Sequence, residues 1–293
     1  MKKTSLSRKV FLTFDVLIMI ALMVVCLYPM LYVLFASLSD SGKLMATTGL
    51  LLKPVGFSMA AYKSVIHNPM IITGYGNTLF ILVIGVCINL VMTTLAAYFL
   101  SRRSNIMLKK QIMAFMLFTM YFSGGMIPTF VNIKELGLYN SLWSLILPGA
   151  ISTYNLIIMR TSFMGIPTSL EEAAYLDGAG HLSIIWNVIV PLSKAIIAVM
   201  ILYYGVGYWN SWFNASIYLN DRTKYPLQLV LREILLQNDT ATMTQGATAA
   251  EDYSIAESIK YAVVVVSTLP ILCVYPFLQK YFVKGVMVGA VKG

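Results

Sequence analysis

The stretch EEAAYLDGAGHLSIIWNVIVP (residues 171–191) lies between two apolar runs that are each long enough to cross a membrane. Two capping boxes are available at its start, Thr168 with Glu171 and Ser169 with Glu172. The two carboxylates also suit the positive end of a helix dipole. The spacing therefore predicts a short helix that begins near Ser169.

Two stripes of side chains follow at helical spacing. The first is narrow and consists of Leu170, Ala173, Ala174 and Asp177. Gly178 can end the helix in the left-handed conformation, and a bulkier stripe comes after it, namely Leu182, Ile185, Trp186 and Ile189. The pattern predicts a helix, a bend and a second helix along the membrane surface. An ordinary interfacial connector would show similar amphipathic spacing.

The composition places this segment in a membrane protein. Of the 293 residues, 58% are hydrophobic and 11% are charged, and the mean hydropathy is +0.77, which excludes most soluble classes. Six apolar runs have the length of a membrane-spanning helix: 14–38, 77–100, 111–131, 142–159, 195–213 and 261–278. They lack the alternation of barrel strands, so we expect an all-α membrane protein with one transmembrane domain over residues 1–293.

The basic residues predict the orientation of the chain. With six spans, residues 1–13, the loop around 101–110, residues 165–191 and the C-terminus share one side. This side carries 13 of the 21 lysines and arginines when Arg160 and Lys194, at the edges of the third of these segments, are counted. The other side carries 8 basic and 8 acidic residues. The positive-inside rule therefore places both termini in the cytoplasm and explains the net charge of +9 without nucleic-acid binding. The start MKKTSLSRKVF precedes an apolar run too long for a signal peptide, so we expect an uncleaved anchor.

Two outer segments and two interrupted spans leave alternatives open. Residues 39–76 and 214–260 form the outer loops, and the polar stretch QNDTATMTQGATAAEDYS (residues 237–254) is either flexible or a docking loop. The third run contains Gly124, Gly125 and Pro128, and the fourth contains Pro148 and Gly149. Such residues break membrane helices near a transport pathway or form packing kinks.

The sequence EAAYLDGAGHLSIIWNVIVP resembles the EAA loop of ATP-binding-cassette (ABC) importer permeases. The matching positions are Glu172, Ala173, Ala174, Gly178, Val188, Val190 and Pro191, with valine at two positions where the family often has isoleucine or leucine. In that family the loop seats in a cleft of a cytoplasmic ATPase subunit. The resemblance implies that the residues coupling this chain to the ATPase are Glu172, Ala173, Ala174, Asp177, Gly178 and Pro191.

The resemblance extends over most of the chain. LAAYFLSRR (residues 95–103) and YWNSWFNASIYLND (residues 208–221) are similar to maltose-type carbohydrate importers, especially the branch named after lipoprotein-linked oligosaccharide permeases. That branch implies the six-helix permease fold of type I importers in the bacterial cell membrane. It also implies a second homologous permease forming a heterodimer, two copies of an ATPase that uses ATP and Mg²⁺, and an extracytoplasmic sugar-binding lipoprotein. Transport would proceed by alternating access.

The chain lacks the residues for chemistry of its own. There is no phosphate-binding GxxxxGK[ST] loop, since the single Gly-Lys pair, Gly42 and Lys43, precedes Leu44. His67 and His181 are the only histidines, without an HExxH motif, and the three cysteines have no CxxC spacing. We expect a permease rather than an enzyme, with no metal site and no directly bound cofactor.

Aromatic and amide side chains are the candidates for sugar contact, because aromatic faces stack on sugar rings and amides bind hydroxyls. They are Tyr121, Asn132, Tyr154, Asn155, Trp209, Asn210, Trp212 and Asn214. An aromatic belt at the membrane interface would explain the YWNSWFN cluster equally well. A self-contained carrier or channel for a small polar solute is the alternative function. Proton coupling usually needs ionisable groups within spans, and Asp15 and Arg160 lie only near span ends.

Overall fold

The computed structural model describes residues 6–102, 108–237, 258–274 and 276. Within these ranges the ordered elements are helices, with one isolated bridge between Ser39 and Phe57 and no strand. The chain divides into two compact units, residues 1–68 with 233–269 and residues 69–232 with 270–293. The all-α class predicted from the sequence is confirmed.

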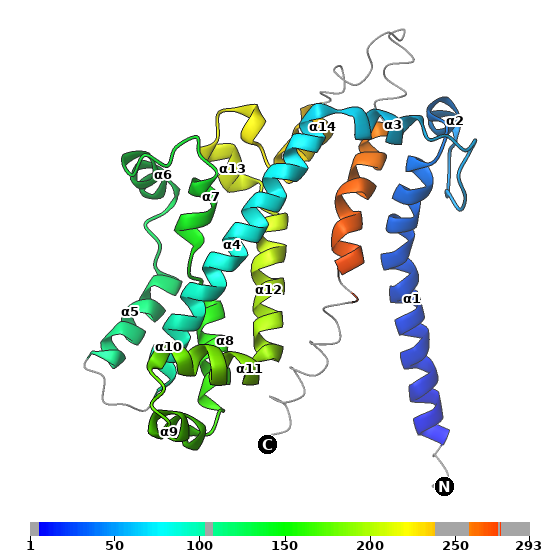
Figure 1. The fold of residues 1–293 in the computed structure, drawn as a ribbon. Helices are drawn as coiled ribbons and strands as arrows, with labels where there is room; N and C mark the ends of the chain where they lie inside the picture. Colours follow the sequence, from blue (N-terminus) through cyan, green and yellow to red (C-terminus); the bar gives the residue numbers. More distant parts are fainter. Residues whose placement is uncertain (1–5, 103–107, 238–257, 275, 277–293) are drawn as a thin grey trace. The chain divides into compact units, whose positions relative to one another are not determined.

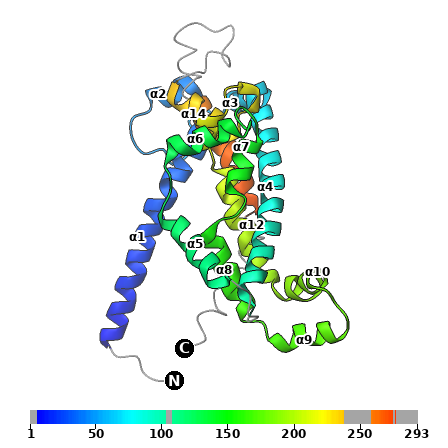
Figure 2. The ribbon, with the colours of Figure 1, turned by 90° about the vertical axis from the view of Figure 1, so that its left-hand side faces the viewer.

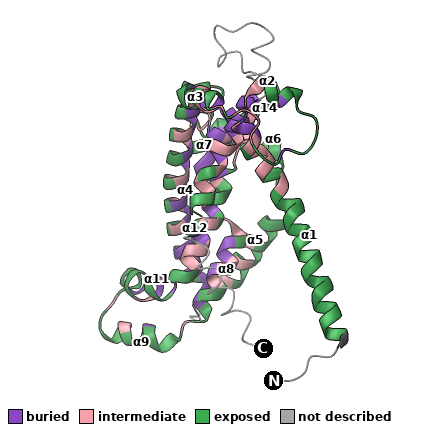
Figure 3. Cartoon of the chain, turned by 90° about the vertical axis from the view of Figure 1, so that its right-hand side faces the viewer, coloured by how far each residue is buried: buried purple, intermediate pink, exposed green. Residues whose placement is uncertain are grey.

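The first unit contains the long N-terminal helix α1 (Leu6–Ser37), two short helices and the helix Ser258–Val274 as far as Leu269. α1 is long and apolar enough to cross a membrane, and its most apolar window has no buried residue (Figure 3). The short helices α2 (Ser41–Ala46) and α3 (Ala60–His67) lie in the expected outer loop 39–76, which is therefore partly helical. Ser37 and Tyr62 share a 2.7 Å hydrogen bond that fixes α3 to the end of α1.

The second unit is built around α4 (Pro69–Ser101), which packs against α8 (Thr153–Met164) and α12 (Lys194–Trp209) (Figure 1). α4 has no polar face, and its buried side chains are distributed along its whole length. The largest fully buried side chains of this core are Leu100, Leu156, Met159, Phe163, Ile184, Ile189 and Met200. They lie toward the Ser101 end of α4, so this end is a well-packed anchoring point.

The third and fourth runs are both divided at the interrupting residues that the sequence indicates. The third is divided into α5 (Lys109–Tyr121) and α6 (Met126–Glu135), which meet at 115°. Gly125 turns the chain there with a φ of +87°, a conformation that L side chains rarely adopt. The fourth is divided into α7 (Trp143–Ile146), the short turn η1 (Leu147–Gly149) and α8. Pro148 and Gly149 interrupt it as the sequence indicates.

Buried polar contacts hold α4 to the break in the fourth run. Asn89 Nδ2 donates to the Gly149 carbonyl at 2.7 Å, and Tyr208 donates its hydroxyl to Asn89 Oδ1 at 2.7 Å. Thr93 Oγ1 and Tyr204 Oη form a further 2.7 Å hydrogen bond between α4 and α12. The carbonyl freed by the break thus has a partner, as an apolar surrounding requires.

The far end of α4 holds part of the second expected outer loop. This part comprises α13 (Phe213–Tyr218), η3 (Arg222–Lys224) and the start of α14 (Leu227–Gln237). Asn77 Nδ2 donates to the Thr223 carbonyl at 2.8 Å, and Thr78 Oγ1 accepts from Leu227 N at 2.8 Å. Residues 214–232 are therefore tied to α4, while nearly all of the polar stretch 237–254 lies outside the described residues.

Candidate coupling site

The predicted coupling helix is α9 (Thr168–Leu176), which lies with α10 (His181–Ile184) at the Ser101 end of α4 (Figure 2). It begins at Thr168, so the predicted start near Ser169 is confirmed. The capping boxes are wrong: the residue at the N-cap is Pro167, and no side chain caps the helix. Glu171, which should have closed one box, forms an ion pair with Arg102 instead.

The predicted stop at Gly178 is confirmed. Gly178 has a φ of +82° and its amide donates to the Tyr175 carbonyl at 3.0 Å. The next amide, of Ala179, donates to the Ala174 carbonyl at 2.9 Å. This pair of bonds is a Schellman motif, which satisfies carbonyls at the helix end and turns the chain toward α10.

The two adjacent glutamates point in different directions. Glu171 is 6% exposed and faces the body of the unit, whereas Glu172 is exposed. Successive residues of a helix are about 100° apart, so one carboxylate can serve the interior and the other a partner. The exposed face of α9 also includes Leu170, Ala173, Leu176 and Asp177, and Ala174 is partly buried. Leu176 is 89% exposed, which leaves a large apolar side chain without cover in this chain.

The second stripe does not face one way as predicted. Ile185 and Ile189 are buried, but Leu182 and Trp186 are exposed at 65% and 48%. The cause is a π-helical stretch, η2 (Ile185–Ile189), which adds a residue to the turn and shifts the phase of the stripe. Pro191 follows in α11 (Val190–Leu192), just before an 88° bend into α12.

Several elements converge on the last turn of α4. The Arg102 guanidinium, which pairs with Glu171 of α9, also lies over the Tyr98 ring, 4.7 Å from its centroid. Tyr98 Oη lies 3.3 Å from His181 Nδ1, and Tyr175 Oη lies 3.1 Å from His181 Nε2. His181 is exposed, yet it is bonded to both α4 and α9.

Two further cations reach the carbonyls at this helix end. Arg160 Nε of α8 donates to the Leu100 carbonyl at 3.0 Å, and Lys109 Nζ of α5 donates to the Arg102 carbonyl. Cations at a helix C-terminus interact favourably with the dipole and with carbonyls that lack helical partners. Burial lowers the pKa of the Arg102 guanidinium, and the nearby Tyr98 and Tyr175 raise it. Arginine remains charged near neutral pH, so Arg102 is a permanent cation here.

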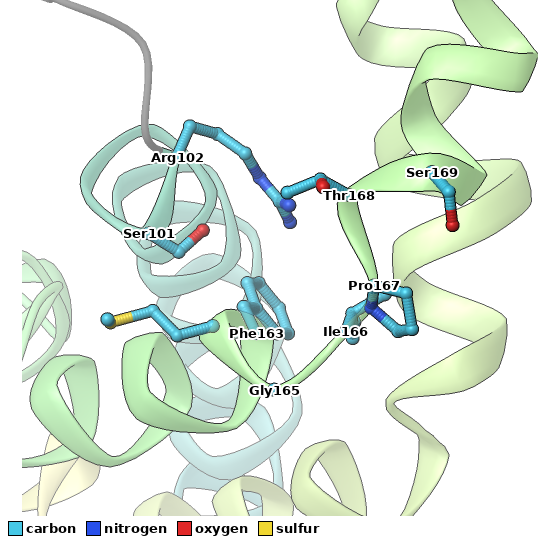
Figure 4. A pocket seen from close by; sticks show the side chains of 9 residues that line it. Ser101, Arg102, Phe163, Gly165, Ile166, Pro167, Thr168 and Ser169 are labelled. Atoms are coloured by element: carbon cyan, nitrogen blue, oxygen red, sulfur yellow. The ribbon is translucent and has the colours of Figure 1, made fainter.

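A cavity of about 330 Å³ lies between the end of α4 and the start of α9. It is lined by Ser101, Arg102 and residues 163–169. Figure 4 shows the Arg102 side chain extending across it toward Thr168, with Phe163 beneath. The cavity leaves space on one side of the Arg102 side chain.

The candidate sugar-contact residues fall into three groups on different elements. Tyr121 ends α5 and is 79% exposed, and Asn132 is exposed on α6. On α8, Tyr154 is 54% exposed and Asn155 is buried. The group at the end of α12 comprises Trp209, which is 5% exposed, Asn210, Trp212 and Asn214. Trp209 packs edge-on to Tyr75 and Trp212 lies under Arg232, at 3.5 Å from the guanidinium carbon. Their role in sugar contact stays a prediction.

The contacts missed from the sequence are the Arg102–Glu171 pair and the Asn89–Tyr208 bond. Asn89, a polar residue within an apolar run, was the available sign of the second. Within the described residues no group of three His, Cys, Asp or Glu side chains could hold a metal ion.

Broken helices within an apolar bundle and a two-helix elbow at one end are the features expected of an ABC importer permease. Residues 90–288 match the family described as "Binding-protein-dependent transport system inner membrane component", and the chain belongs to this family.

Two relatives and one solved structure are similar to this chain over nearly its whole length. "Protein LplC" of Bacillus subtilis is 41% identical over 92% of this chain and 90% of its own length. The "Polygalacturonan/rhamnogalacturonan transport system permease protein YtcP" of the same organism is 41% identical over 96% of this chain and 97% of its own. One chain of a crystallised bacterial ABC transporter "involved in the import of the acidic polysaccharide alginate" aligns with a TM-score of 0.88 and 31% identity, over 96% of this chain and 100% of that chain.

Proposed function

We propose that this chain is a permease subunit of an ATP-driven oligosaccharide importer and that α9 docks on a cytoplasmic ATPase. The main support for this proposal is the exposed face of α9, on which Glu172, Ala173 and Leu176 are uncovered. The other face of the same helix is fixed to the end of α4. Small side chains allow a close approach, and an uncovered leucine beside a carboxylate suits a partner surface with both apolar and basic groups.

The complete transporter contains a second, homologous permease, two copies of the ATPase and an extracytoplasmic sugar-binding lipoprotein. ATP and Mg²⁺ bind to the ATPase. Both termini lie in the cytoplasm, which the distribution of lysine and arginine supports. The apolar surfaces of α1 and α5 support a large contact with lipid and the second permease, because α5 has no buried residue in this chain.

Transport follows from the movement of α9. When ATP closes the two ATPases, their docking sites carry α9 with them, and the bundle changes between inward-open and outward-open states. An acidic plant-type oligosaccharide is the cargo we propose. Its support is that YtcP is named for the transport of polygalacturonan and rhamnogalacturonan, and that the solved transporter imports alginate, so both handle acidic polysaccharides.

A docking test uses Ala173→Glu, with Ala173→Ser as its matched control. We expect Ala173→Glu to lower co-purification of the ATPase by about tenfold, since a buried, unpaired charge is costly at an interface. Ala173→Ser adds little volume and retains the ATPase. Membrane insertion of both variants is unchanged, because α9 lies outside the spans. An intact purified assembly in which no ATPase contacts α9 would overturn the assignment.

Cargo class is tested separately, by uptake into proteoliposomes that contain the whole transporter and excess binding protein. We expect uptake of oligogalacturonides to exceed that of neutral maltooligosaccharides. Equal or preferential uptake of the neutral sugars would contradict the acidic class and leave the importer assignment intact.

A further inference from the structure

The Arg102–Glu171 ion pair lies behind the docking face of α9. Glu171 is 6% exposed, and the side chains of Arg102 and Glu171 are 12% and 8% exposed. A surface ion pair contributes little, but a pair removed from water holds its geometry, because separating it leaves an uncompensated charge. The pair is thus suited to fix the position of α9 relative to α4.

The pair is reinforced from the second helix of the elbow. His181 of α10 bonds Tyr98 of α4 and Tyr175 of α9, and Tyr98 also lies under the Arg102 guanidinium. Both helices of the elbow are therefore fixed to one turn of α4. A displacement of α9 cannot occur without breaking these contacts or moving that turn.

From this turn, α4 extends past the broken fourth run to the outer segment at its other end, and both would move in transport. It has 33 residues, which at about 1.5 Å per residue give a length of about 50 Å. Along it, Asn89 holds the break at Gly149, and near its start Asn77 and Thr78 hold residues 223–227. A rigid movement of α4 therefore acts on the broken fourth run and on the outer segment together.

We propose that Arg102 and Glu171 form a strut that transmits the displacement of α9 to α4, as positioning residues in the coupling of ATP hydrolysis to transport. The inference rests on the proposed docking of α9. It assigns the two glutamates different roles: Glu172 belongs to the docking face, and Glu171 connects that face to the bundle.

The test measures sugar uptake and ATP hydrolysis in the same reconstituted transporter, with ATPase co-purification as a third readout. Glu171→Gln removes the charge of one partner at nearly constant volume, and Arg102→Gln removes the guanidinium together with its contact to the Tyr98 ring. We expect each to lower the uptake per ATP hydrolysed by about tenfold, the size of a typical coupling between sites. The ATPase remains bound, because the docking face is unchanged.

The charge-swapped double variant Arg102→Glu with Glu171→Arg supplies the rescue. We expect it to recover a large part of the lost coupling ratio, whereas a purely structural role predicts lower thermal stability with an unchanged ratio. Glu172→Gln gives the contrasting result, weaker ATPase binding with a normal ratio in the complexes that form.

The two proposals fail in different ways. If wild-type chain binds no ATPase through α9, the docking proposal fails. If it binds the ATPase and both single variants keep the wild-type ratio of uptake to hydrolysis, the strut is overturned and docking stands. Loss of the ratio in the single variants without recovery in the swapped variant also overturns the strut.

Discussion

Tyr208 of α12 donates a 2.7 Å hydrogen bond to Asn89 of α4 at a point where α4 carries a glycine, Gly85, against the Tyr208 ring. An added Cβ at Gly85 would lie 2.5 Å from a ring carbon, closer than real contacts allow. The close approach and the hydrogen bond depend on each other. The missing side chain lets the ring reach Asn89, and the bond then holds the ring in place.

Asn89 is the residue whose loss should affect this region most. Asn89→Leu leaves the Gly149 carbonyl and the Tyr208 hydroxyl unpaired in an apolar surrounding, so we expect it to lower the free energy of unfolding by about 1–3 kcal/mol. Tyr208→Phe removes one of the two bonds, and we expect a loss of about 1 kcal/mol. Thermal unfolding in detergent measures both. Equal stability of Asn89→Leu and wild type would show that the bonds contribute nothing.

Gly85→Ala should lower the free energy of unfolding by about 1–3 kcal/mol through overpacking. The Tyr208 ring can move away from the added methyl group only by breaking its hydrogen bond to Asn89. Gly205→Ala on α12, where an added Cβ meets no atom within 4 Å, is the control. A double-mutant cycle with Tyr208→Leu identifies the cause. If the clash is with the ring, Gly85→Ala should lower the free energy of unfolding much less in the Tyr208→Leu background. An equal cost in both backgrounds would place the clash elsewhere.

The spans could be predicted from the sequence, because the length and hydropathy of a run are local properties. The breaks were also signalled, by Gly124 and Gly125 in the third run and by Pro148 and Gly149 in the fourth. Their consequence was not. The 115° bend between α5 and α6 depends on what each half packs against, and a glycine pair only permits it.

In the coupling site, too, local features could be predicted from the sequence and contacts between distant segments could not. The start of α9 and the left-handed Gly178 follow from local rules, and both are confirmed. Glu171 was assigned to a capping box because sequence spacing shows only neighbours along the chain. Its partner Arg102 follows a different span, and only the packing of α8 and α10 against the end of α4 brings the two together.

At Gly178 the effect of backbone conformation can be tested separately from a steric clash. Nothing lies within 4 Å of an added Cβ, so Gly178→Ala changes only the backbone preference at a φ of +82°. We expect a cost of about 1–2 kcal/mol in local stability and a loss of ATPase binding as the elbow loses its shape. Gly178→Asn should retain more binding, since asparagine tolerates this conformation.

Gly180 is the matched control for that turn. Its φ is −77° and it also has open space around it, so Gly180→Ser introduces a side chain without strain and can still cap α10. We expect wild-type ATPase co-purification for Gly180→Ser. Equal losses for Gly178→Ala and Gly180→Ser would mean that side-chain bulk, not backbone conformation, matters in this loop.

The proposed sugar contacts at the end of α12 are best tested at Asn210. Its side chain is exposed and bonds only the Val206 carbonyl of its own helix within the described residues, so Asn210→Ala should leave stability near wild type. If Asn210 binds a sugar hydroxyl, its loss should raise the half-saturating concentration for uptake by about tenfold. The assay uses proteoliposomes with the binding protein in excess, and basal ATP hydrolysis is measured alongside.

Trp209 requires a more conservative substitution because it is buried against Tyr75. Trp209→Ala would also lower the free energy of unfolding by about 3–5 kcal/mol through lost packing. Trp209→Phe keeps an aromatic ring and removes the indole N–H, which has no hydrogen-bond partner within the described residues. Should that N–H serve the sugar, Trp209→Phe weakens uptake affinity severalfold while the unfolding temperature changes little. A normal half-saturating concentration for both Trp209→Phe and Asn210→Ala would remove this end of α12 from the pathway and favour its role as an aromatic belt at the membrane interface.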